Sequence, residues 1–261
     1  VKSSHSIICA TFDFLRRDHE ILNMVDDNNN GEVIGRLGEY SPIGTKLIQT
    51  LKTIGTGSYI LRGDDEGKEF SQIKFSELPI GTIPDRFTMW GRFAYNNIDA
   101  CNGRNIFLFE GATDPTGLCL TVRYGGLVQD WHWALQFSHA VGGDSQTVYR
   151  PYIVFHELPI TNVDEGEVFV CVSMSKGDSV SMFVGNLLTG EFHAQRLDWD
   201  SWIHPAEMTD ELWEDLGSFS IGYNDYSSGN RPIGLELRIC QFQLIINQYY
   251  NADNLEDKTA I

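Results

Sequence analysis

The sequence of 261 residues lacks the features of two large classes of protein, those that cross membranes with helices and those that bind nucleic acids. No apolar run approaches the roughly 20 residues that a membrane-spanning helix needs. The 19 Lys and Arg residues form no basic cluster, and 36 Asp and Glu residues give a formal charge of −17, which repels phosphate backbones. We therefore expect no membrane insertion, no nucleic-acid partner and an acidic, solvated surface.

The sequence also lacks the common catalytic motifs. It contains no Gly-x-Ser-x-Gly, no phosphate-binding P-loop, and no His-x-His or His-x-x-x-His spacing that would favour zinc. The seven histidines are scattered, which favours ordinary core or surface positions. No strand-like segment carries acidic residues at three alternate positions. These absences favour a protein that is not an enzyme and has no cofactor.

Paired cysteines are missing as well. The five cysteines are an odd number without short paired spacings, and most of them lie inside apolar, strand-like runs. This pattern favours buried free thiols, which are typical of a chain that folds in a reducing cytosol. One buried disulfide between sheets is the alternative. The five are Cys9, Cys119, Cys171 and Cys240 in the strand-like runs, and Cys101 in a turn-like segment.

The sequence does contain strong β-strand patterning. Residues 168–175 and 179–185 are rich in β-branched and aromatic residues, and the tripeptide Lys-Gly-Asp at 176–178 is a typical reversal. These segments predict a β-hairpin with one packed face and one wetter face. A second turn over residues 186–190 returns the chain toward a further strand.

Similar strand-like segments occur along the chain, separated by turns rich in Gly, Asp and Asn. Helices do not alternate with them, which favours an antiparallel arrangement over a parallel sheet. Residues 204–216 are the exception, because Met208, Leu212 and Leu216 recur at helical spacing and acidic residues come early. The predicted fold is an all-β antiparallel β-sandwich, or jelly roll, with one short surface helix.

Several short motifs follow one another in an order that has a counterpart among known folds. They are Phe12-Asp13, an Asp/Asn/Gly-rich turn at 26–31, the strand entry at 83–90, the hairpin at 168–185, Ile221-Gly222 and the strand at 234–239. This order resembles the laminin-G-like and concanavalin-A-like lectin-glucanase jelly rolls of bacterial and phage type. The resemblance spans nearly the whole chain and implies a single laminin-G-like β-sandwich domain over residues 1–261.

Aromatic and polar residues in predicted loops are the candidate binding residues. Sugars bind where an apolar ring face lies beside amides and carboxylates, and loops at the end of a sandwich often carry such sites. Burial in the core is the alternative for each aromatic, and it is favoured for the strand pair. The candidates for glycan or partner binding are Trp199 and Trp202 in one loop, Asn224, Asp225 and Tyr226 in another, and Trp131 and Trp133 on one strand.

Calcium is the metal that the resemblance suggests, since lectin-type jelly rolls hold Ca²⁺ with oxygen atoms from loops. Ordinary turn chemistry also explains the acidic turns of this chain, because Asp and Asn side chains hydrogen-bond to nearby backbone. We assign no metal, and calcium stays an alternative with Asp26, Asp27, Asp64 and Asp65 as candidate ligands.

A lectin-like fold without catalytic residues predicts a non-catalytic binding or structural module. With free cysteines, it suits a virion surface component (a decoration, fibre or adhesin domain) that folds in the cytosol and acts on a virion or at an extracellular surface. The expected partners are other virion or surface proteins, copies of itself in a homo-oligomer, and glycans. One alternative is a secreted carbohydrate-binding module, although residues 1–6 carry no apolar segment that indicates a signal peptide. The other is a glycan-cleaving enzyme of the same fold, which needs two carboxyls about 5 Å apart.

Overall fold

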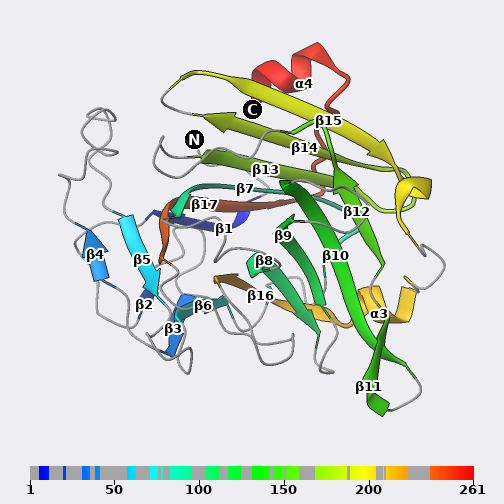
Figure 1. Cartoon of the computed structure of the whole chain (residues 1–261), viewed down its shortest axis with the longest axis horizontal. Coiled ribbons are helices and arrows are strands. Elements are labelled where there is room, and N and C mark those ends of the chain that lie inside the picture. The colour runs from blue at the N-terminus through cyan, green and yellow to red at the C-terminus, as the bar shows by residue number, and fades with distance from the viewer. Residues whose placement is uncertain are drawn as a thin grey trace.

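Two antiparallel sheets make up the structure, a computed structural model of the chain (Figure 1). No helix among the described residues is both long and apolar enough to cross a membrane. The described residues are 6–11, 20–21, 31–35, 39–41, 58–62, 71–75, 78, 83–95, 104–111, 117–124, 131–141, 144–149, 151–158, 168–186, 189–203, 208, 210–222 and 236–261.

The first sheet has eight strands in the order β15-β14-β13-β7-β17-β5-β4, with β1 also paired to β17. Adjacent strands of this sheet run antiparallel. Its strands are β1 (Ser6–Thr11), β4 (Glu39–Ser41), β5 (Ser58–Arg62), β7 (Arg86–Tyr95), β13 (Val168–Ser175), β14 (Ser179–Asn186), β15 (Phe192–Asp198) and β17 (Glu236–Ile246).

The second sheet has nine strands in the order β11-β10-β9-β8-β16-β6-β3-β2, with β12 also paired to β10. Its strands are antiparallel as well. They are β2 (Glu20–Ile21), β3 (Gly31–Gly35), β6 (Ser71–Phe75), β8 (Arg104–Gly111), β9 (Gly117–Tyr124), β10 (Trp131–Val141), β11 (Asp144–Tyr149), β12 (Tyr152–Phe155) and β16 (Leu216–Gly222).

The main core lies between the two sheets. Phe242 of β17 stacks on Phe219 of β16 with ring centroids 4.9 Å apart, and Phe87 of β7 meets Phe109 of β8 edge to face at 5.1 Å. Each pair joins one sheet to the other, which is the packing that defines a sandwich. The predicted all-β antiparallel sandwich is therefore confirmed.

The predicted hairpin is β13 and β14. The strands pair from Val168 with Asn186 to Ser175 with Ser179, and the N–H of Asp178 donates to the carbonyl of Ser175 at 3.0 Å. Gly177 closes the turn with φ of 75°, a conformation that glycine adopts without a Cβ clash.

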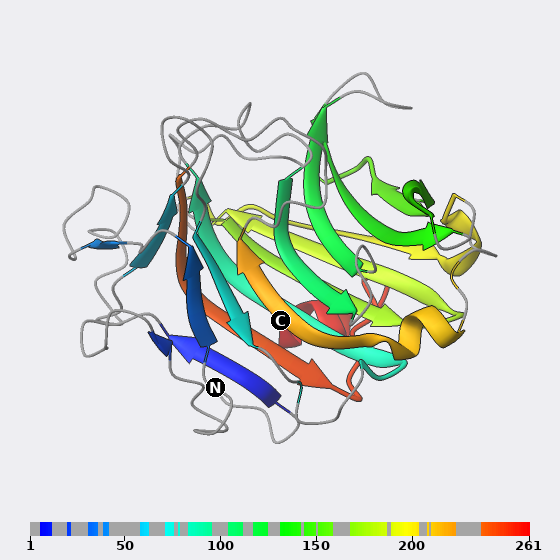
Figure 2. The same ribbon diagram turned by 90° about the horizontal axis from the view of Figure 1, so that it is seen from below.

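The wetter face expected for this hairpin is wrong, since all eight residues of β14 and seven of the eight of β13 are buried. The chain after β17 turns back and covers the outer face of the first sheet. In Figure 2 its helix α4 (Leu255–Ala260) lies behind that sheet, while the second sheet lies in front. We call residues 247–261 the covering segment.

The predicted surface helix at 204–216 is shorter in the structure. Helix α3 spans Asp210–Glu214, and Leu216, expected on the helix, is the first residue of β16. Two further short helices among the described residues were not expected, α4 and the 3-10 helix η2 (Trp199–Ser201). Among the cysteines whose side chains are described, Cys119 and Cys171 are free and buried as predicted.

Candidate functional site

A charged cleft of about 650 Å³ opens beside the turn of the β13–β14 hairpin. The register of β13 on β7 pairs Ser175 with Arg86, so the turn residue Lys176 falls next to Asp85. The backbone N–H of Lys176 donates to the carbonyl of Asp85 at 2.8 Å. The remaining lining comes from Ile83, Pro84, Trp213, Glu214 and Asn247.

Lys176 is a charged residue of the cleft with several side-chain contacts. Its Nζ donates to Oδ1 of Asp210 at 2.5 Å and lies 3.9 Å from Oδ1 of Asp85. The same ammonium lies 5.3 Å from the ring centroid of Trp213, within the range of a cation–π contact. Lys176 is thus held in place from three sides and is itself only 18% exposed.

Arg86 and Asn247 form the opposite part of the lining. The N–H of Asn247 donates to the carbonyl of Arg86 at 2.8 Å. Asn247 has φ of 55°, a left-handed conformation that Asn tolerates better than most residues, and its side chain is exposed. The Arg86 side chain is also exposed, and it forms no ion pair with the described residues. Its guanidinium is therefore available to a ligand.

Trp213 connects the cleft to a cluster of aromatic rings. It is 2% exposed, and its ring lies 6.5 Å from Phe137 and 6.2 Å from Trp199. Trp199 in turn lies 5.7 Å from Trp202. The indole nitrogens of Trp202 and Trp213 are buried without a hydrogen-bond partner among the described residues. A buried donor without a partner costs roughly 1–3 kcal/mol, so the packing of this aromatic cluster has to offset that cost.

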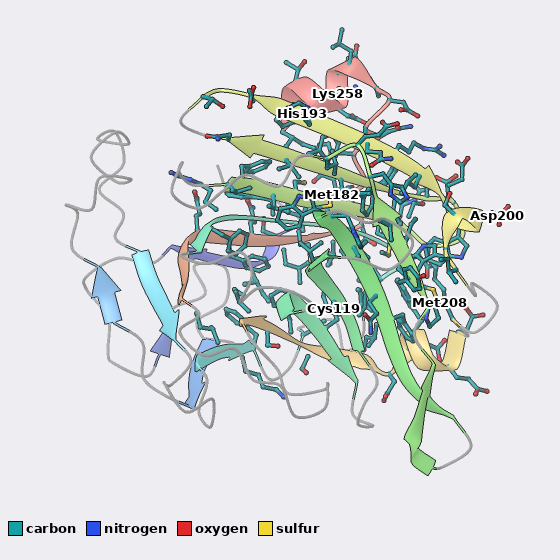
Figure 3. The ribbon with its side chains drawn as sticks, viewed as in Figure 1. Cys119, Met182, His193, Asp200, Met208 and Lys258 are labelled. Carbon is teal, nitrogen blue, oxygen red and sulfur yellow. The ribbon has the colours of Figure 1, made fainter. Side chains whose placement is uncertain are left out.

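Three of the sequence-based binding candidates have side chains that the structure describes. Trp199 is partly buried and packs on the core at the cleft end of the sandwich, where Figure 3 labels Asp200 and Met208. Trp202 is 3% exposed and offers almost no face to a ligand. Trp133 is wholly buried, which corrects its assignment as a binding residue, because β10 turns this side chain into the core.

The side chains of the other candidates are not described by the structure. Trp131 is the first residue of β10, but its side chain is not described. The described residues contain no group of three or more His, Cys, Asp or Glu side chains placed to hold a metal ion. Outside the described residues are Asn224, Asp225 and Tyr226, and the calcium candidates Asp26, Asp27, Asp64 and Asp65.

The sequence reasoning missed the residues that line the cleft. Lys176 was interpreted only as a turn residue, and Trp213 only as part of a short helix. Their positions depend on contacts between segments far apart in the chain, such as Lys176 with Asp85. The one available signal was the placement of Lys-Gly-Asp at the end of a strongly patterned hairpin.

Two carboxylates meet at Lys176, which raises the question of catalysis. Glycosidases use paired carboxyls, and their general acid is kept protonated by an apolar environment. Asp85 and Asp210 are 79% and 83% exposed, and the ammonium lies against both. This arrangement favours the binding of polar groups over acid catalysis.

Comparison with known proteins extends only to the fold. No protein-family model and no curated protein matches the sequence. Solved structures that resemble it include the receptor-binding domain of a botulinum neurotoxin of mosaic serotype C/D (TM-score 0.52, 14% identity) and the serotype D binding domain (0.51, 12%); each match covers 98% of this chain and 51% of the toxin chain.

A phage protein is also similar. The enzymatically active domain of tailspike protein 2 from bacteriophage CBA120 matches with a TM-score of 0.50 and 10% identity, over 84% of this chain and 29% of the other. The chain thus spans about half the length of the toxin domains and less of the tailspike. At these identities the likeness supports a β-rich, lectin-like or jelly-roll type of fold.

Proposed function

We propose that the chain is a non-catalytic binding module whose cleft at the hairpin turn takes a polar glycan. The observation that carries the proposal is a cleft of about 650 Å³ whose walls hold the exposed side chains of Asp85, Arg86 and Glu214 beside Lys176. Carboxylates accept hydrogen bonds from sugar hydroxyls, and a guanidinium donates to them. Asp85 and Glu214 supply the first kind of group, and Arg86 supplies the second.

The solved neighbours add support of a general kind. The two toxin structures are described as binding or receptor-binding domains, and a third similar structure, the binding domain of botulinum neurotoxin DC, is described as a complex with SialylT. A shared sandwich makes a binding role plausible, but the ligand has to be argued from the cleft itself. The mixed charges of the cleft favour a ligand that carries many hydroxyls and few apolar groups.

A glycan array of neutral and acidic sugars tests the proposal. For any sugar that binds, Arg86→Ala should weaken affinity about 10- to 100-fold, because losing a hydrogen bond to a charged group removes about 1.5–3 kcal/mol. Glu214→Gln keeps the shape and removes one charge, and it should weaken binding less.

Lys258→Ala is the matched control, since it removes the same charge as Arg86→Ala. Lys258 lies on α4, far from Asp200 at the cleft end of the molecule in Figure 3. An array without any binding sugar contradicts the proposal, and so does an Arg86→Ala protein that binds as tightly as Lys258→Ala.

We further propose that the module acts on a virion surface, as a decoration, fibre or adhesin domain, after folding in the cytosol. The free, buried thiols of Cys119 and Cys171 support folding in a reducing compartment. A secreted carbohydrate-binding module would use the same cleft but would fold under oxidising conditions. Mass spectrometry of the native protein separates the two, because disulfides among its cysteines would favour the secreted alternative. Cross-linking in the native particle would identify partner proteins or identical copies.

Glycan cleavage is the second candidate function. It is supported by the tailspike neighbour, which is described as an enzymatically active domain, and the carboxyls to test are Asp85 and Asp210, which meet at Lys176. Incubating the protein with a sugar that it binds, followed by mass analysis, would detect cleavage products. Products that disappear in both Asp85→Asn and Asp210→Asn would favour the enzyme over the binding module.

A further inference from the structure

The covering segment is held on the first sheet by hydroxyl groups. The N–H of Tyr250 donates to Oγ of Ser173 at 2.7 Å, and the N–H of Ala252 donates to Oγ of Ser181 at 3.0 Å. The hydroxyl of Tyr249 lies 2.7 Å from Oγ of Ser179. These contacts fix the segment above strands β13 and β14, where Figures 1 and 2 show α4 on the outer side of the sheet.

A second cavity, of about 460 Å³, lies between this segment and the sheet. Its walls include Trp90, Phe169 and Ile245 on the sheet and Tyr250 and Ile261 on the covering segment. Trp90 and Phe169 lie 5.8 Å apart with their rings tilted by 36°. The volume falls within the range typical of small-molecule sites.

The cavity exists because a small side chain stands among large ones. In the sheet register Cys171 pairs with Trp90 on one side and with Phe183 on the other, so the three share the outer face. The cysteine fills far less space than its aromatic neighbours. The covering segment does not fill the gap, since the small Ala252 is the fully buried residue that it contributes to this cluster.

The polar groups in the cavity wall already have partners. Nε1 of Trp90 donates to Oε1 of Gln243 at 2.9 Å, and Nε2 of Gln243 donates to Oγ of Ser6. Oγ1 of Thr88 donates to the carbonyl of Gln248 at 3.0 Å. A ligand would therefore meet mainly ring faces and aliphatic groups.

The side chains that line the cavity carry no charge. No Asp, Glu, Lys, Arg or His side chain lines it, although the chain carries a net charge of −17. Burial raises the pKa values of the Cys171 thiol and the Tyr250 phenol, so both stay neutral at pH 7. A charged ligand would lose its hydration here without gaining a partner, which disfavours it strongly.

We propose that this cavity binds an uncharged small molecule built on an aromatic or aliphatic ring, at a site separate from the glycan cleft. The ring would pack against Trp90, Phe169 and Tyr250, which supply aromatic surface to the cavity wall. Helix α4 forms the wall through which the ligand enters. None of the α4 residues is buried, whereas Ala252, which anchors the segment, is 1% exposed.

Fluorescence titration with N-phenyl-1-naphthylamine, an uncharged aromatic probe, tests the proposal. Wild-type protein should give a saturable, blue-shifted signal with a dissociation constant of about 100 µM or tighter. Ala260→Trp should weaken binding at least about tenfold, because Ala260 lines the cavity and lies on the exposed helix α4, where a larger side chain blocks the space without disturbing the core. Thr259→Trp adds the same ring to the neighbouring residue, which does not line the cavity, and should leave binding unchanged.

Two results would overturn the proposal: a wild-type titration without saturable binding, or Ala260→Trp and Thr259→Trp proteins that bind the probe equally well. Ile261→Asp provides a second variant, since it places a charge at the cavity wall and should also weaken binding. Glycan binding should be unaffected by Ala260→Trp, so failure of this site and failure of the glycan cleft are separate outcomes.

Discussion

Replacing Ser173 by alanine should destabilise the protein far more than the small change in side-chain size suggests. Ser173 is fully buried on the outer face of β13. Thr88 gives its hydroxyl proton to the carbonyl of Gln248, so in the 2.7 Å contact between Thr88 and Ser173 the serine is the donor. The same serine oxygen accepts from the N–H of Tyr250 at 2.7 Å. Ser173 therefore uses both its donor and its acceptor.

The expected loss follows from these two bonds. Ser173→Ala leaves the N–H of Tyr250 without this acceptor and Oγ1 of the fully buried Thr88 without this donor. A net hydrogen bond contributes about 1 kcal/mol and an unsatisfied buried group costs roughly 1–3 kcal/mol, so we expect a loss of about 2–4 kcal/mol. Urea denaturation followed by far-ultraviolet circular dichroism measures this loss.

Ser175→Ala is the matched control for this experiment. Ser175 is buried on the same strand and the same face, but its side chain forms no hydrogen bond with the described residues. The control should lose less than about 1 kcal/mol, as substitutions that break no hydrogen bond usually do. Equal losses in Ser173→Ala and Ser175→Ala would refute the reasoning. Hydrogen exchange at the Tyr250 amide should also speed up only in Ser173→Ala, because the covering segment is released there.

Three further predictions concern two single residues, Cys171 and Gly177. The raised pKa of the Cys171 thiol, caused by burial, should make it resist iodoacetamide in the folded protein at pH 9 and react once urea unfolds the chain, as peptide mass analysis can check. Because the folded pKa lies above the unfolded one, Cys171 contributes stability below about pH 8.5 that is lost as the pH rises toward the folded pKa; in Cys171→Ala this part of the pH dependence should vanish. Gly177→Ala should lower stability by about 1–2 kcal/mol through backbone strain alone, since φ is 75° and no atom lies within 4 Å of an added Cβ; an unchanged denaturation midpoint would contradict this.

The hairpin could be predicted from sequence because its signals are local. Alternation of apolar residues over 168–175 and 179–185 and a glycine within the turn suffice to give both strands and their register. What lies on the outer face could not be predicted in this way. Ser173 and Ser181 look like residues of a wetter face, and their burial depends on a segment some 70 residues further along the chain.

The cleft was unpredictable for a related reason. Lys176 and Asp85 are brought together by the pairing of β13 with β7, and Trp213 reaches Lys176 from helix α3. No local sequence pattern predicts these contacts, because each residue also fits an ordinary local position: Lys176 in a turn, Asp85 before a strand and Trp213 in a helix. The aromatic loop at 199–202 was nevertheless a useful guide, since Trp199 contacts the Trp213 that lines the cleft.

The buried serines on the outer face of the first sheet explain why one particular segment covers it in one register. An apolar face would accept many covers of similar shape, whereas a hydroxyl must be matched by a partner at the right distance. Ser173 and Ser181 are directly paired across β13 and β14, and they receive the N–H groups of Tyr250 and Ala252, two residues apart on the covering segment. A shift of that segment by one residue would break both bonds and leave the two serine oxygens without these N–H donors. The serines therefore fix the register of the covering segment, and with it the depth of the cavity that the segment closes.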